Sequence, residues 1–124
     1  MIRLRGVLAL ALLITAVSAT LNATEQTGSK SFDIEITERQ VVGESKLLRV
    51  NQGDEVVLNW QTDETVTIHL HGYDIEKTIV AGEATSMSFT AHATGRFPVT
   101  SHGFANEHAG NGHQALMYFE VYPE

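Results

Sequence analysis

The segment TVTIHLH at residues 65–71 decides the fold class. Apolar and polar residues alternate through it, so one side of the segment is apolar and the other is polar. Because side chains along a β-strand point alternately to the two faces of a sheet, this period of two predicts a half-buried strand. The same spacing places His69 and His71 together on the polar face.

Similar alternation recurs along the chain, whereas no stretch has a convincing helical period. Turn-forming sequences such as NQGD at residues 51–54 separate the alternating segments. We count seven or eight short strands with turn signals about every 8–12 residues, which is typical of a β-sandwich or small barrel. Residues 103–112 lack an apolar pattern and are rich in glycine and asparagine, so we expect a long loop there.

The beginning of the chain differs in composition from the rest. Two arginines precede a short apolar run and then small residues, which predicts a signal peptide over residues 1–23 with cleavage after Ala19 or Ala23. An uncleaved membrane anchor is the alternative. We expect a flexible lead-in over 24–31, a single domain over 32–124, and an exported protein in the periplasm or outside the cell.

Charge and cysteine content exclude several classes of function. The net charge is −7, and without Arg3 and Arg5 six basic residues face fifteen acidic ones, which gives −9. This balance argues against binding to nucleic acid and suits docking to a basic partner protein. There is no cysteine, so disulfides, zinc–thiolate sites and cysteine nucleophiles are excluded.

The histidines are the candidate functional residues, because imidazole is the commonest metal ligand in proteins. Five of the six fall within residues 69–71 and 102–113, the second group around the expected loop. Met117 follows the last of them by four residues, and a thioether beside imidazole favours copper. A core position for Met117 is the alternative, and His92 is expected at the surface. The six are His69, His71, His92, His102, His108 and His113.

Several motifs, in order, resemble the cupredoxin family of small copper-binding β-sandwiches. They are VNQGDEV at 50–56, HLHGY at 69–73, the segment from 81 to 99, and GHQALM at 112–117. The resemblance implies a Greek-key β-sandwich. It also implies that His71 occupies the position of the upstream copper histidine and that residues 112–117 form the end of the copper loop.

The chain departs from the family in having no cysteine, so a blue-copper electron-transfer centre is not expected. We expect instead a histidine-rich copper ion site for copper storage, delivery or tolerance. Its candidate ligands are His71, His102, His108, His113 and Met117. We do not expect an enzyme, although a copper enzyme with an open coordination position is an alternative. A metal-free interaction module of the cell envelope is another.

Overall fold

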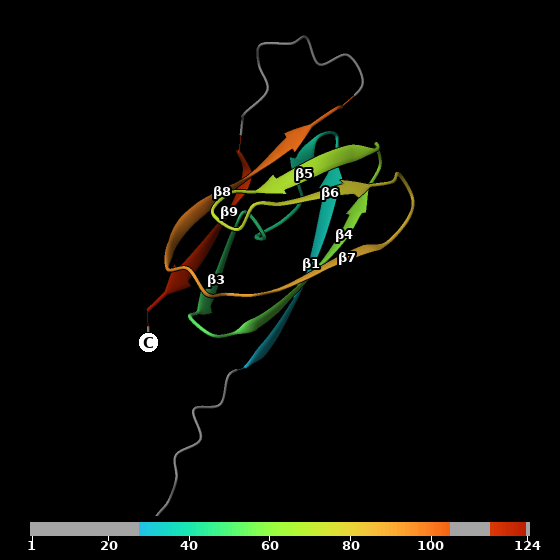
Figure 1. Cartoon of the computed structure of the whole chain (residues 1–124). Coiled ribbons are helices and arrows are strands. Elements are labelled where there is room, and N and C mark those ends of the chain that lie inside the picture. The colour runs from blue at the N-terminus through green and yellow to red at the C-terminus, as the bar shows by residue number, and fades with distance from the viewer. Residues whose placement is uncertain (1–27, 105–114, 124) are drawn as a thin grey trace, which may run out of the picture.

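The computed structural model describes residues 28–104 and 115–123, where nine β-strands form two sheets (Figure 1). The four-stranded sheet has the order β2-β1-β4-β7. Its strands are β1 (Ser29–Thr37), β2 (Gln40–Val41), β4 (Glu55–Thr62) and β7 (Thr85–Thr90). The five-stranded sheet has the order β3-β9-β8-β5-β6. Its strands are β3 (Leu47–Asn51), β5 (Val66–Leu70), β6 (Ile75–Ile79), β8 (Gly95–His102) and β9 (Ala115–Tyr122).

Both sheets are mixed, since β1 runs parallel to β4 and β3 runs parallel to β9 while the other neighbours are antiparallel. Parallel neighbours need crossover connections, so the chain passes repeatedly from one sheet to the other. This arrangement confirms the expected all-β sandwich. The first strand begins at Ser29, inside the segment that we expected to be a flexible lead-in.

The core lies between the sheets and is built from the inward-facing side of each strand. Trp60 of β4 and Phe119 of β9 are its largest fully buried side chains, and each is 0% exposed. Alternate residues of β5, namely Val66, Ile68 and Leu70, are buried beside them. Burying a side chain of this kind contributes about 1.5–3 kcal/mol, so the inward-facing residues of the alternating strands stabilise the sandwich.

The turn before β4 is held by a buried carboxylate. Asp54 is 5% exposed and accepts hydrogen bonds from the amides of Asn51, at 2.9 Å, and Gly28, at 3.2 Å. The Gly28 carbonyl in turn accepts a bond from the Glu55 amide at 3.1 Å. The NQGD turn therefore also fixes the start of β1.

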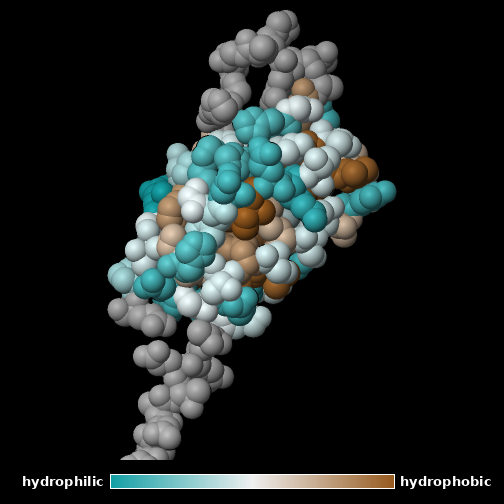
Figure 2. All heavy atoms as spheres, viewed as in Figure 1, coloured by the Kyte–Doolittle hydropathy of each residue, from teal (hydrophilic) through white to brown (hydrophobic). Residues whose placement is uncertain are grey.

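The face in Figure 2 is covered mainly by hydrophilic residues, with hydrophobic ones visible between them. Within the described ranges all regular secondary structure is β, so no helix there is long and apolar enough to cross a membrane.

Candidate metal centre

Two histidines lie side by side on the outer face of the five-stranded sheet. His69 in β5 and His71 just after it alternate with the buried Ile68 and Leu70, so both rings point away from the core. Their ring centroids are 4.2 Å apart. The prediction that these two imidazoles share the polar face is therefore confirmed.

A third histidine reaches the same face from the neighbouring strand β8. The antiparallel register pairs His69 with Thr100 and Thr67 with His102, so His102 lies diagonally across from His69. The centroids of the His69 and His102 rings are 6.4 Å apart. Residues 67–71 and 100–102 are far apart in the sequence, and the pairing of β5 with β8 brings them together.

The other neighbour of β5 supplies a carboxylate. The hairpin between β5 and β6 pairs Leu70 with Ile75, and the next pair is His69 with Glu76. One ligand atom each from His69, Glu76 and His102 lies within 4.8 Å of the others. Three strands of one sheet thus contribute three potential metal ligands at one place, which we call the outer-face site.

Glu76 was not among the residues singled out from the sequence. Its placement depends on a turn that closes at Leu70 and Ile75, with Gly72 (φ +82°) and Asp74 (φ +54°) in left-handed conformations. A glycine three residues after His69 is a turn signal. A tight hairpin there puts residue 76 directly opposite residue 69, so this signal was present in HLHGYDIE.

Among the residues that the structure describes, His71 contacts Thr100 and Pro98 and does not belong to the group of three ligands. Its Nε2 lies 3.0 Å from the Thr100 Oγ1, and its amide donates to the Pro98 carbonyl at 3.1 Å. Thr100 is only 3% exposed, so this hydroxyl is a fixed partner. The His71 ring consequently packs against His69 in a set orientation.

The site is electrostatically suited to a cation. The His69 side chain is 21% exposed, and its Nε2 is 3.7 Å from the Oδ1 of the fully exposed Asp74. Asp74 and Glu76 therefore supply two carboxylates beside partly buried imidazoles.

An aromatic cluster supports the turn that follows His71. Tyr73 packs against Phe89, Phe97 and Phe119, and its hydroxyl donates to the Ala93 carbonyl at 2.8 Å. Burial raises the pKa of Tyr73, so it remains a neutral hydrogen-bond donor. His92 is exposed, which agrees with the surface position expected for it, and its ring packs on the Tyr73 ring with the two centroids 4.8 Å apart.

The remaining predicted ligands are Met117, which the structure describes, and His108 and His113, which it does not. Met117 is 1% exposed and lies on the inward face of β9 with Phe119 and Val121, on the core side of the sheet. That is the core position weighed as the alternative. His108 and His113 lie outside the described residues, so their assignment stays a prediction.

The donor set of the outer-face site fits copper. Imidazole nitrogen is a preferred ligand of Cu(II), and divalent copper binds nitrogen and oxygen donors more tightly than the other first-row divalent metals do. Two imidazoles and one carboxylate would hold the ion from three sides. Glu76 is exposed, so the ion would be open to solvent on the side of this carboxylate.

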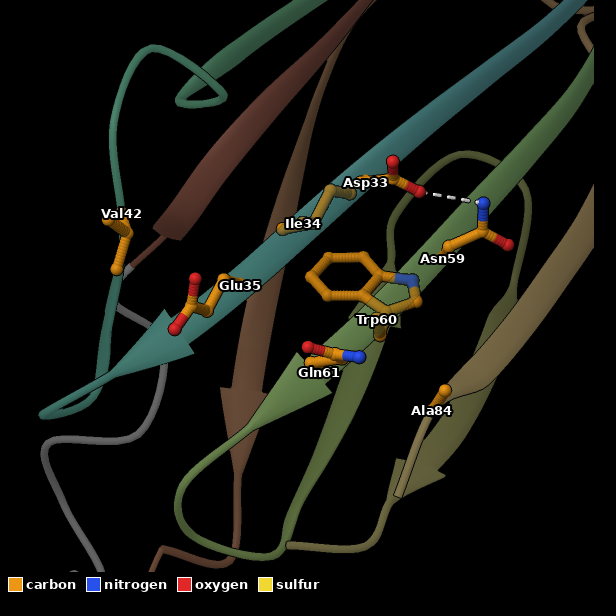
Figure 3. A pocket seen from close by; sticks show the side chains of 8 residues that line it. All are labelled: Asp33, Ile34, Glu35, Val42, Asn59, Trp60, Gln61 and Ala84. Atoms are coloured by element: carbon orange, nitrogen blue, oxygen red, sulfur yellow. Dashed lines mark hydrogen bonds between the residues drawn. The ribbon is translucent and has the colours of Figure 1, made fainter. Parts of the chain in front are cut away.

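A hollow lies on the four-stranded sheet, and its polar groups differ from those of the outer-face site. It has a volume of about 470 Å³ and is lined by the outer faces of β1 and β4, including Asp33, Glu35, Asn59 and Gln61 (Figure 3). Asn59 donates to the Asp33 carboxylate at 3.0 Å. Its lining contains no imidazole or sulfur, so its donors do not suit copper.

Comparison with known proteins gives the fold a context. No protein-family model and no curated protein sequence matches the chain. Among solved structures, it is similar to a blue copper oxidase from Nitrosomonas europaea, with 23% identity over 77% of this chain and a TM-score of 0.58. A copper-containing nitrite reductase from Thermus scotoductus gives 20% identity over 78% of this chain and a TM-score of 0.57.

A multicopper oxidase from Pseudomonas thermotolerans is also similar, with 19% identity over 78% of this chain and a TM-score of 0.59. The chain covers 39%, 28% and 30% of these three structures respectively, so it spans well under half of each. At this identity the matches establish the fold, which is a cupredoxin-like β-sandwich as the sequence motifs indicated.

These comparisons correct one expectation. We expected that the protein is not an enzyme, because its sequence shows no substrate pocket and no obvious proton donor. The similar structures are copper oxidases and a copper nitrite reductase by name, so cupredoxin-like domains occur within copper enzymes. The fold therefore gives no ground for excluding catalysis.

Proposed function

We propose that this protein binds a copper ion at the outer-face site and serves in copper storage, delivery or tolerance. The observation that carries the proposal is the meeting of ligand atoms from His69, Glu76 and His102 within 4.8 Å of one another. The solved structures that share the cupredoxin-like fold are named as copper proteins, which supports copper as the metal.

In this proposal the residues have separate roles. The imidazoles of His69 and His102 hold the ion, and Glu76 supplies negative charge. His71, hydrogen-bonded to Thr100, keeps the His69 ring in place. The Thr100 hydroxyl thus acts on the His69 ring through His71, in the way that outer-sphere partners orient ligands in metal sites.

The acidic composition of the chain is consistent with this role. A net charge of −7 raises the local concentration of cations and suits docking to a basic partner protein. We further propose that the protein is exported, because residues 1–23 have the composition of a signal peptide.

The test is a competitive Cu(II) titration of the full chain. His69→Ala and His102→Ala should each weaken binding by about tenfold or more, since each removes one of three ligands. His92→Ala is the matched control, because His92 is an exposed histidine outside the site, and it should bind copper like the unmodified chain. Equal affinity in all four proteins would contradict the site assignment.

A second candidate function is a copper enzyme with an open coordination position. It is favoured by the three-ligand group, which leaves positions for a small molecule, and by the named activities of the similar structures. The readout is azide binding to the copper-loaded protein, followed by spectroscopy of the copper. A spectrum unaffected by azide at saturating concentration would contradict an open position.

A further inference from the structure

We propose that the outer-face site is selective for the oxidation state of copper: it binds Cu(II) and releases the metal on reduction to Cu(I). The inference rests on the proposed copper function and adds a mechanism of release to it. It follows from which donor atoms the sheet presents outward and which it buries.

The outward-facing donors favour Cu(II). Glu76 brings an anionic oxygen to a group whose other donors are the imidazole nitrogens of His69 and His102. Carboxylate oxygen is a hard donor that binds divalent ions well, whereas Cu(I) prefers soft thioether and thiolate sulfur. The carboxylate therefore contributes far more to holding Cu(II) than to holding Cu(I).

Within the described residues, soft donors are buried away from this face. The chain has no cysteine, and its three methionines are Met1, Met87 and Met117. Met87 is 4% exposed and Met117 is 1% exposed, and both are part of the core cluster between the sheets. Among the described residues, neither thioether is thus available to retain the ion after reduction.

The site is also open to a reductant. Glu76 is exposed on the edge strand β6, and Asp74 beside it is fully exposed, so a small molecule can approach the ion. The reductant is an enediol such as ascorbate, which gives one electron to Cu(II), becomes its radical and loses a proton to solvent. The Cu(I) formed leaves for an acceptor with sulfur donors, and the imidazoles and carboxylate are left free of metal.

The test compares the affinities of the full chain for Cu(II) and Cu(I), each measured by competition with a chromophoric chelator. We expect Cu(II) to bind at least about tenfold more tightly than Cu(I). Glu76→Gln should weaken Cu(II) binding by about tenfold and change Cu(I) binding by less than about threefold. Glu83→Gln is the matched control, because Glu83 is an exposed glutamate in the turn between β6 and β7.

A second variant guards against replacement of the carboxylate. The Asp74 Oδ1 is 3.7 Å from the His69 Nε2, so Asp74 is able to take over from Glu76, and the double change Asp74→Asn with Glu76→Gln removes both. A parallel experiment adds ascorbate and a Cu(I) chelator to the copper-loaded chain, and we expect release of the copper.

The outcomes distinguish a failure of copper binding from a failure of selectivity between Cu(II) and Cu(I). If the unmodified chain fails to bind Cu(II), the proposed function itself is wrong. If it binds Cu(II) but holds Cu(I) as tightly, keeps its copper after reduction, or loses both affinities equally in the double variant, only the oxidation-state inference is overturned.

Discussion

Replacing Gly72 by alanine tests how the turn after His71 is built. Gly72 has φ +82°, and a Cβ at this position would lie 2.2 Å from Cδ1 and 2.4 Å from Cε1 of the Phe97 ring. Phe97 is partly buried and packs edge-on against Tyr73, with the ring centroids 5.3 Å apart, so a movement of its ring disturbs the aromatic cluster. The substitution must therefore shift the turn or the aromatic cluster.

The expected loss of stability has two parts. The left-handed conformation costs alanine about 1–2 kcal/mol relative to glycine. Overpacking against the Phe97 ring adds about 1–3 kcal/mol. Gly82→Ala should lose only the conformational part of this free energy, because Gly82 has φ +77° and no atom lies within 4 Å of a Cβ added there. The difference between the variants, about 1–3 kcal/mol, isolates the contact with Phe97.

The assay is reversible urea unfolding followed by the fluorescence of Trp60, the single tryptophan, which is fully buried. Thermal unfolding should give a Tm for Gly72→Ala about 5–20 °C below that of Gly82→Ala. Because the turn carries His71 and sets the pairing of His69 with Glu76, Cu(II) affinity should fall as well. Equal stability of the two variants would refute the close packing of Gly72 on Phe97.

Three further perturbations follow from the contacts described above. Thr100→Val removes the hydroxyl that binds His71 Nε2, so it should weaken Cu(II) binding several-fold and alter the electron paramagnetic resonance spectrum of the bound copper. Thr100→Ser should restore both the affinity and the spectrum, and an unchanged spectrum in the valine variant would argue against positioning through His71. Asp54→Ala removes the acceptor of the Gly28 and Asn51 amides and should cost about 1–3 kcal/mol in urea unfolding, whereas a cost near zero would show that water replaces the carboxylate. Hydrogen bonds from Arg49 and then Tyr122 lower the pKa of Glu120, so ionised Glu120 stabilises the fold above its unfolded pKa, and this contribution is lost as the pH falls through the lowered pKa. Arg49→Leu should therefore flatten the plot of unfolding free energy against pH below about pH 4, and a plot identical to that of the unmodified chain would contradict this.

Much of the fold could be predicted because burial leaves a direct mark on strand sequences. In residues 65–71 every second side chain is buried, so the alternation alone gives the strand, its inner face and the common face of His69 and His71. The NQGD turn was equally readable, since Asp54 bonds to the amide of Asn51 within the motif itself.

The composition of the site was harder to predict because it depends on register between strands. His102 reaches His69 only through the pairing of β8 with β5, and Glu76 only through the hairpin that closes at Leu70 and Ile75. Family resemblance drew attention to His71, whose Nε2 lies 3.0 Å from the Thr100 Oγ1, and its role as a ligand stays a prediction. Met117 showed the strand alternation of a core residue, and packing decided its place over the chemistry of its sulfur.

The central claim is that copper binds on the outer face of the five-stranded sheet, between β5, β6 and β8. Anomalous diffraction at the copper absorption edge, from crystals of the copper-loaded chain, tests it most directly. We predict one strong anomalous peak, which marks a copper ion bonded to ring nitrogens of His69 and His102 and to the carboxylate of Glu76. A peak elsewhere on the molecule, with these three side chains free of metal, would contradict the account.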